Sequence, residues 1–220
     1  MTPTTDRIHL LIVDDHESVL SGTVSALEQA YPNAIIRTAT TVEAVDEELK
    51  HGLPNVLVMD LSIPSAPNEP SQIESGIDLL RRLMEAHTHL NIVVQSAHIK
   101  ALIRLMPSIY DHRGGFTIAD KNLPLREMLE KVDWALKGVV YTPQHMRTRL
   151  EIRPEWLQVL QHAFGEGLQD KAIAERINVS ERTVRHYWSK LQDALSVYPE
   201  AGKNIRIQTE IRAREEGLID

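Results

Sequence analysis

The sequence predicts an α/β domain with a doubly wound, five-stranded parallel sheet, followed by a small all-α domain. Up to residue 137, short apolar runs alternate with amphipathic stretches, and this repeated order places parallel strands between two layers of helices. From residue 157 onward only helical periodicity remains. A polar stretch with weak periodicity separates the two patterns, so we expect domains at 1–142 and 153–220, joined by a linker at 143–152.

Each element of the first domain has its own signal in the chain. Continuous apolar runs are typical of strands buried on both faces, and they predict strands at residues 8–13, 34–39, 56–59, 92–94 and 116–119. Amphipathic periodicity predicts helices at residues 19–30, 41–50, 76–86, 100–110 and 125–137. Thr40 and Glu43 form a T-x-x-E pattern that is predicted to cap the second helix, and Pro107 is predicted to limit the end of the fourth.

Composition excludes several classes of protein. The 220 residues include no cysteine, which excludes disulfides and thiolate metal sites. No apolar run approaches the roughly 20 residues needed to cross a bilayer. The net charge of −7 argues against a cationic membrane-bound protein, although a local basic face would still allow nucleic-acid binding. The sequence has no Gly-rich phosphate loop and no G-x-S-x-G motif, so we expect that it is not an enzyme. From the absence of cysteine and of a long apolar run, we expect a cytoplasmic protein with no membrane partner.

The residues that follow the predicted strands are charged or polar. Asp14 and Asp15 follow the first strand, Asp60 the third, Ser96 the fourth and Lys121 the fifth. In open parallel sheets, ligands bind beyond the carboxyl ends of the strands. Three carboxylates at that end would repel one another, and a hard divalent cation such as Mg²⁺ relieves the repulsion.

These residues suit phosphoryl transfer. Asp60, central in the sheet, is a candidate nucleophile toward phosphorus. Lys121 and the metal would stabilise charge on the transferring group, and the Ser96 hydroxyl would bind the new phosphate. The alternative is that these side chains are helix caps and solvated turn residues.

Four segments resemble the CheY-like receiver domain of two-component response regulators over roughly residues 7–142: "LLIVDDHESVLSG", "VLVMDLSIP", "VVQSAH" and "IADK". The resemblance implies a flavodoxin-like fold with Mg²⁺ as its cofactor. The roles that it implies are phosphoacceptor for Asp60, metal ligands for Asp14, Asp15, Asp60 and the backbone of Ser62, and phosphate switch for Ser96 and Lys121. A receiver that folds but is never phosphorylated is a further alternative.

The chain departs from that family in several places, among them Asn122, which stands where the family usually has a proline after the lysine. Ile118 stands three residues before the lysine, where the family usually has an aromatic switch residue. The loop after the third strand is also longer, because "SAPNEPSQIES" separates Pro64 from Gly76. Ser71 and Glu74 offer a possible helix cap within it. We expect this loop to restrict or select access of the kinase.

The second domain contains a candidate DNA-reading helix. Asn178 suits a left-handed turn and Ser180 suits an N-cap. On the following helix, one face is apolar, with Val184, Trp188, Leu191 and Leu195, and the opposite face is polar, with Arg182, Arg185, His186 and Ser189, flanked by Lys190. Arginines presented in this way read guanine edges and phosphates in the major groove. The alternative is an ordinary solvated helix face.

Two segments resemble the LuxR-type helix-turn-helix: "GLQDKAIAERINVSERTVRHYWSKLQDAL" and "IRAREEGLI". Together with the receiver pattern they resemble the NarL/FixJ class of response regulators. This implies a sensor histidine kinase and double-stranded promoter DNA as partners, and a homodimer on DNA or after phosphorylation, with Ile207 and Ile211 of the closing helix as dimer contacts. Arg206 and Lys203 lie close to that helix and are expected to reach phosphates. The chain departs from the family at "RPEWLQVL" and in about one extra residue around 162–167.

The features together predict a response regulator transcription factor in which Mg²⁺-dependent phosphorylation of Asp60 controls DNA binding. One alternative is a constitutive DNA-binding regulator whose receiver only docks other proteins. Another is an aspartyl-phosphate phosphatase, but Ser62 stands where such an enzyme has its second aspartate.

Overall fold

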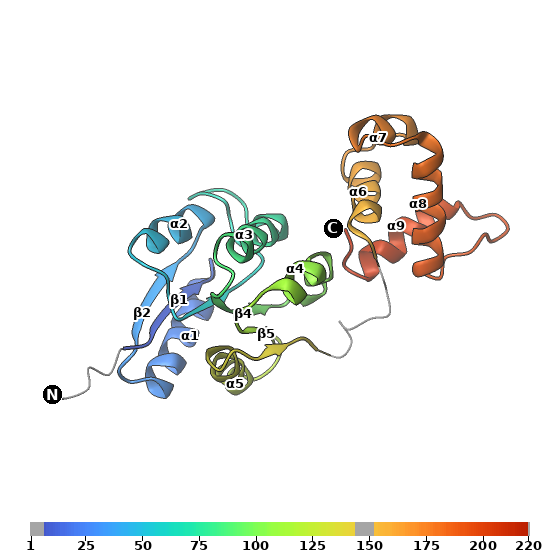
Figure 1. The fold of residues 1–220 in the computed structure, drawn as a ribbon. Coiled ribbons are helices and arrows are strands. Elements are labelled where there is room, and N and C mark those ends of the chain that lie inside the picture. The colour runs from blue at the N-terminus through green and yellow to red at the C-terminus, as the bar shows by residue number, and fades with distance from the viewer. Residues whose placement is uncertain (1–6, 144–151, 220) are drawn as a thin grey trace. The chain divides into compact units, whose positions relative to one another are not determined.

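The computed structural model describes residues 7–143 and 152–219. The chain divides into two compact units, with the main boundary after Pro143 (Figure 1). The predicted linker at 143–152 lies almost entirely outside the described residues, and the predicted domain limits stay predictions.

The first unit is built on a parallel sheet with the strand order β2-β1-β3-β4-β5-β6 (Figure 1). The strands are β1 (His9–Val13), β2 (Ile35–Ala39), β3 (Val56–Met59), β4 (Asn91–Ser96), β5 (Phe116–Asp120) and β6 (Val140–Tyr141). The first five confirm the predicted strands to within two residues at each end. The predicted number of five strands is wrong by one, because β6 has only two residues and is too short to show a periodicity in the sequence. The short sixth strand forms where Gly138, with a φ of 75°, turns the chain back beside β5.

Helices cover both faces of this sheet, which confirms the doubly wound α/β fold (Figure 1). They are α1 (Glu17–Ala30), α2 (Val42–Lys50), α3 (Ile73–Ala86), α4 (Met106–Asp111) and α5 (Leu125–Leu136). On one face, Leu10, Val58 and Val93 form a buried cluster with Leu27 of α1 and Val132 of α5. The helices α2, α3 and α4 lie on the other face (Figure 1).

Two helices begin differently from the sequence prediction. The cap of α2 is Thr41, whose Oγ1 accepts a hydrogen bond from the Ala44 N–H at 3.1 Å, so the predicted cap at Thr40 is wrong by one residue. The helix α3 begins three residues earlier than predicted, and its N-cap is Gln72. The predicted cap at Ser71 is wrong, because its hydroxyl donates to a carboxylate of another segment.

The predicted helix at 100–110 is wrong in form. A 3₁₀ helix, Ile99–Leu105, comes first, and the short α4 follows with Pro107 in its first turn. A proline lacks an N–H and clashes with the carbonyl four residues earlier, so it disrupts the interior of a helix and is tolerated in its first turn. Pro107 therefore marks the start of α4 and not the end.

The second unit consists of helices. They are α6 (Pro154–Leu160), α7 (Asp170–Arg176), α8 (Glu181–Ala194) and α9 (Ile205–Glu215). Their core includes Leu160, Ile173, Leu191 and Ala213, one from each helix. A π-helical turn, Gln161–Gly165, follows α6. Because a π turn is wider than an α turn by one residue, it accommodates the extra residue that the sequence carries around 162–167.

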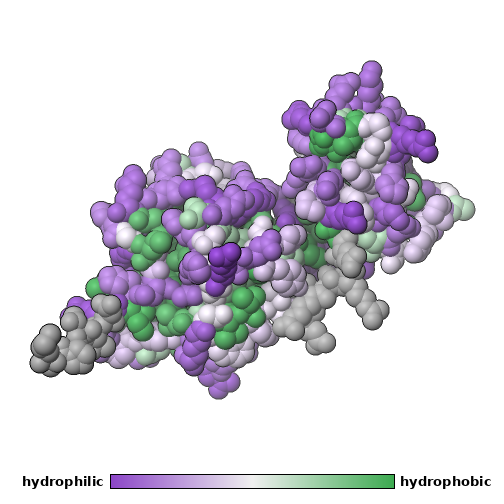
Figure 2. Space-filling view, in the orientation of Figure 1, coloured by the Kyte–Doolittle hydropathy of each residue, from purple (hydrophilic) through white to green (hydrophobic). Residues whose placement is uncertain are grey.

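The face shown in Figure 2 is mostly hydrophilic on both units, with apolar side chains gathered in small patches. Residues 7–143 and 152–219 include no helix with the length and apolarity that a membrane span requires. Exposed large apolar side chains include Leu53 in the first unit and Ile207 and Ile211 in the second. The last two are one turn apart on α9, so they form an exposed apolar pair.

Candidate functional site

Four side chains that can bind a metal meet beyond the carboxyl ends of β1 and β3. Asp14, Asp15 and His16 follow β1, and Asp60 follows β3, so the pairing of these two strands brings them together. One ligand atom from each residue lies within 4.8 Å of those of the other three. Asp14 and Asp60 are each only 4% exposed. We call these four residues the acidic cluster.

Lys121, directly after β5, brings a positive charge to the acidic cluster. Its Nζ lies 2.5 Å from Oδ2 of Asp14 and 2.7 Å from Oδ2 of Asp60. Burial by itself lowers the pKa of a lysine, but hydrogen bonds to the two carboxylates outweigh this effect and raise the pKa of Lys121 above its usual 10.5. The ammonium therefore stays charged and compensates two buried carboxylates at once.

Backbone contacts hold Asp60 and Ser96 in place. The N–H of Leu61 donates to Oδ1 of Asp60 at 2.6 Å, while Oδ2 accepts from Lys121. Ser96 is fully buried at the end of β4, and its Oγ accepts from the N–H of His98 at 3.1 Å. Its carbonyl accepts from the N–H of Lys121 at 3.2 Å, which links the two predicted switch residues through the main chain.

The structure thus brings the predicted receiver residues together at one end of the sheet. Ser62 lies in the turn that leaves Asp60, as the resemblance implies. Its role as a backbone metal ligand, and the roles of the other site residues, stay predictions.

Two contacts to Asp15 were not predicted from the sequence. Nδ1 of His16 lies 2.7 Å from Oδ1 of Asp15, and the hydroxyl of Ser71 donates to Oδ2. The place of His16 next to the acidic pair could have indicated the first contact. Ser71 is 56 residues further along the chain, so no local pattern connects it to Asp15.

The acidic cluster is compatible with a divalent metal ion. Its three carboxylates offer oxygen ligands, which hard divalent cations prefer. One ammonium group, that of Lys121, cannot neutralise three carboxylates. A divalent cation would supply the charge that is missing.

The helix α8 presents the predicted DNA-reading face to solvent. Ser180 caps it by accepting a hydrogen bond from the N–H of Thr183 at 3.1 Å, and Asn178 adopts the left-handed conformation with a φ of 55°. Both confirm the sequence prediction. Val184, Trp188 and Leu191 are buried. The exposed residues of α8 include the predicted contacts Arg182, Arg185, His186, Ser189 and Lys190.

Asp170, the first residue of α7, joins three helices of the second unit. Its Oδ1 accepts from Nε1 of Trp188 at 3.0 Å, and its Oδ2 accepts from Nη2 of Arg206 at 2.8 Å. The guanidinium carbon of Arg206 also lies 3.7 Å from the centroid of the Trp188 ring. Burial lowers the pKa of Arg206, and the Asp170 carboxylate opposes this. These contacts hold the partly buried guanidinium in place, and the expected phosphate contact of Arg206 stays a prediction.

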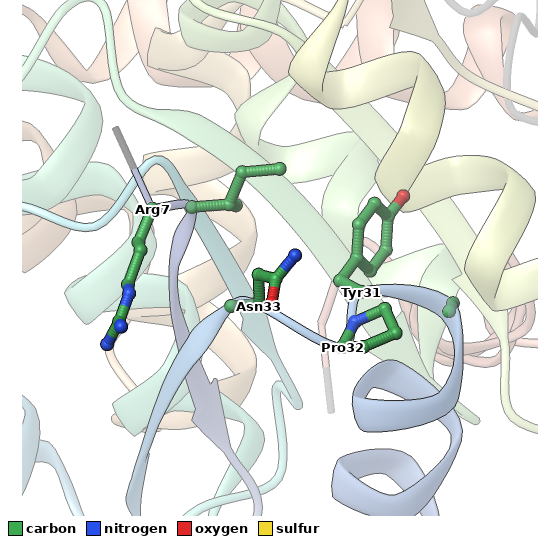
Figure 3. A pocket seen from close by; sticks show the side chains of 7 residues that line it. Arg7, Tyr31, Pro32 and Asn33 are labelled. Atoms are coloured by element: carbon green, nitrogen blue, oxygen red, sulfur yellow. The ribbon is translucent and has the colours of Figure 1, made fainter. Parts of the chain in front are cut away.

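A cavity of about 540 Å³ opens at the other end of the sheet (Figure 3). Arg7, Tyr31, Pro32 and Asn33 line it, close to the amino ends of β1 and β2. Burial and the nearby Asp133 carboxylate raise the pKa of Tyr31. Because the strands are parallel, the cavity and the acidic cluster lie at opposite ends of the sheet, and the cavity is not part of this site.

Comparisons with known proteins agree with this geometry. The transcriptional activator protein ExaE of Pseudomonas putida is 25% identical over 203 residues, which cover 86% of this chain and 90% of that protein. The transcriptional regulatory protein YdfI of Bacillus subtilis is 25% identical and covers 96% of this chain and 97% of its own. With this coverage, both matches extend into the helical unit.

Solved structures share the fold. A structure of the RcsB response regulator of Salmonella typhimurium matches with a TM-score of 0.60 and 22% identity, over 94% of this chain and 100% of that one. A structure of an RcsB–DNA complex matches with a TM-score of 0.59 and 22% identity, over 95% and 98%. The family described as "Response regulator receiver domain" matches residues 10–132, which include every residue of the acidic cluster and Lys121. Since this match spans more than half of the chain, the protein belongs to the response regulator receiver family.

Proposed function

We propose that this response regulator is a transcription factor in which Mg²⁺-dependent phosphorylation of Asp60 controls DNA binding by the helical unit. The observation that carries the proposal is the meeting of Asp14, Asp60 and Lys121 at the carboxyl end of the sheet. The exposed basic face of α8 supports DNA binding by the helical unit. The names of two relatives, a transcriptional activator and a transcriptional regulatory protein, support it as well.

A sensor histidine kinase is the proposed phosphoryl donor. A carboxylate oxygen of Asp60 forms the new P–O bond while the P–N bond of the donor breaks, and the electron pair of that bond stays with the imidazole. The residues proposed to hold Mg²⁺ are Asp14, Asp15, Asp60 and the backbone of Ser62. When bound, the ion supplies positive charge to the phosphoryl oxygens. Lys121, already 2.7 Å from Asp60, adds a second positive charge.

The phosphate changes what the buried end of the sheet can bind. It adds charge and acceptor oxygens. The hydroxyl of Ser96 accepts from His98 and still has its own hydrogen to donate. Movement of Ser96 and Lys121 toward the phosphate would bias a two-state face of the receiver, as phosphorylation switches commonly do.

The helical unit is the proposed DNA-binding part, with domain limits at 1–142 for the receiver and 153–220 for this unit. The proposed DNA contacts are Arg182, Arg185, His186, Ser189 and Lys190. Ile207 and Ile211, both 55% exposed, are the proposed contacts of a homodimer. We place the protein in the cytoplasm, where a sensor kinase and promoter DNA are both within reach.

The test is a DNA-binding assay on the full chain with and without acetyl phosphate and Mg²⁺, in wild type and in Asp60→Asn. We expect Mg²⁺-dependent labelling and tighter DNA binding in wild type, and neither change in the variant. Labelling of Asp60→Asn at the wild-type level would refute Asp60 as phosphoacceptor. Equal DNA affinity in all four conditions would instead favour a constitutive regulator whose receiver only docks other proteins.

A further inference from the structure

The long loop between β3 and α3, residues 62–72, is closed by its own main-chain bonds. Ile63 and Gln72 form an antiparallel bridge, in which the N–H of Gln72 donates to the carbonyl of Ile63 at 3.2 Å. At the far end, the N–H of Glu69 donates to the carbonyl of Ala66 at 3.2 Å. Pro67 and Asn68, with a φ of 69° at Asn68, occupy the positions that a type II turn gives to such residues. The loop is therefore a defined hairpin and not an open excursion.

The outgoing limb of this loop is tied to the start of α2. The N–H of Val42 donates to the carbonyl of Pro64 at 3.0 Å, and the N–H of Glu43 donates to that of Ser65 at 3.1 Å. These are two of the N–H groups at a helix start that lack a partner within the helix. The hydroxyl of Ser65 also lies 2.9 Å from that of Ser75 in α3. The loop is thus held at both of its sides.

The returning limb brings Ser71 to the acidic cluster. Its hydroxyl donates to Oδ2 of Asp15, while Nδ1 of His16 lies 2.7 Å from Oδ1. The Asp15 carboxylate is therefore held through both oxygens. A serine hydroxyl is neutral, so it orients the carboxylate and leaves in place the negative charge that a metal ion needs.

We propose that Ser71 is a positioning residue of the metal site, delivered by the long loop to hold Asp15 in the orientation in which it binds Mg²⁺. This rests on the proposed function. Groups that hydrogen-bond a metal ligand fix its orientation, and their loss commonly weakens metal affinity by about 10- to 100-fold. The loop at residues 62–72 is therefore part of the proposed metal site.

The experiment compares Mg²⁺ binding by calorimetry in the full chain of wild type, Ser71→Ala, Ser71→Thr and Ser65→Ala. We expect Ser71→Ala to raise the Kd for Mg²⁺ about 10-fold and Ser71→Thr, which keeps the hydroxyl, to restore it. Ser65→Ala removes a hydroxyl of the same loop that contacts Ser75, and should leave the Kd unchanged. Labelling by acetyl phosphate should need more Mg²⁺ in Ser71→Ala, with an unchanged rate at saturating Mg²⁺.

Each other outcome has a defined meaning. An equal Kd in wild type and Ser71→Ala would overturn the role of Ser71 and leave the proposed function standing. An equal loss of Mg²⁺ affinity in Ser65→Ala and Ser71→Ala would also overturn the role of Ser71, because the loss would then come from disorder of the loop. A wild type that binds no Mg²⁺ would overturn the metal-dependent function itself, together with the role of Ser71.

Discussion

Lys121 holds two buried carboxylates, Asp14 and Asp60, with one ammonium group. Removing one partner of a buried ion pair typically costs about 3 kcal/mol, because the remaining charge is uncompensated. We therefore expect Lys121→Met to lower the free energy of unfolding by about 3 kcal/mol in EDTA. Mg²⁺ should restore part of this loss, since it replaces the missing positive charge. Urea unfolding with and without Mg²⁺ measures both effects, and an equal stability of variant and wild type in EDTA would contradict the prediction.

The pH dependence of this contribution follows from the raised pKa of Lys121. A raised pKa means that the folded state binds the proton more tightly than the unfolded state does. The advantage of wild type over Lys121→Met is therefore fully present below the usual pKa of 10.5 and is lost as the pH rises through the higher pKa of the folded state. Unfolding free energies of both proteins should differ by a constant amount up to the usual pKa of 10.5 and should begin to converge only above it.

Gly76 allows the first turn of α3 to touch the turn that follows Asp60. A Cβ at this position would lie 2.1 Å from the carbonyl oxygen of Leu61. We expect Gly76→Ala to cost about 1–3 kcal/mol and to slow labelling of Asp60, because the backbone beside it must move. The matched control is Gly22→Ala in α1, where a Cβ meets nothing within 4 Å. That change should be neutral or slightly stabilising in thermal unfolding, since alanine favours helix.

At the scale of elements, Asp170 ties together α7, α8 and α9 through Trp188 and Arg206. Asp170→Ala leaves the Arg206 guanidinium without its carboxylate and the Trp188 N–H without an acceptor. We expect a loss of about 2 kcal/mol in the helical unit, read as faster hydrogen exchange of the α8 amides. Lys171→Ala, at the exposed neighbouring position, should change exchange little. Equal effects of the two changes would show that Asp170 does not join the helices.

The helix α8 should lose DNA affinity when its basic face is reduced. Arg185 is exposed, and within the part of the chain that the structure describes its guanidinium pairs with Glu181 at 3.5 Å, so it is available to a phosphate or base. We expect Arg185→Ala to weaken binding by about 1–3 kcal/mol and, if the contact is to phosphate, to reduce the salt slope by about one. Fluorescence anisotropy at several salt concentrations measures both. Lys137→Ala, at the C-cap of α5, makes the same change of charge in the receiver and should leave DNA binding unchanged.

The sequence predicted the elements that have a repeated local signal. The buried strands, the helix predicted at 125–137 and the Ser180 cap all depend on neighbouring residues, and the structure confirms them. The strand-end residues of the site could be predicted because each directly follows a strand with a clear local signal. Parallel strands then bring their carboxyl ends together at one edge of the sheet. What was missed depends on contacts between distant segments. Ser71 matched the local pattern of a helix cap, but in the structure its hydroxyl donates to Asp15 instead of capping α3.

At the scale of the whole molecule, the proposed function requires an acidic protein to bind acidic DNA. With a net charge of −7, attraction can come only from a local basic face, and two such faces in a dimer would bind better than one. The exposed pair Ile207 and Ile211 is the surface that we assign to dimer formation.

Ile207→Glu should therefore reduce the cooperativity and affinity of DNA binding while the free energy of unfolding changes by less than about 0.5 kcal/mol. Sedimentation of the phosphorylated protein with DNA measures the oligomeric state directly. The control is Leu53→Glu, which places the same charge on an exposed apolar position of the receiver. A dimer that persists in Ile207→Glu on DNA would rule out this surface.

The ammonium of Lys121 means that the receiver carries a resident cation of its own. Because Asp14 and Asp60 already have a partner, the fold does not need an ion from solution to hold these two carboxylates together. Under the proposed function, a magnesium ion that enters the site would have to share both carboxylates with the lysine. We therefore expect the protein to stay folded in a cell short of magnesium and to lose only the phosphorylation that we propose for Asp60.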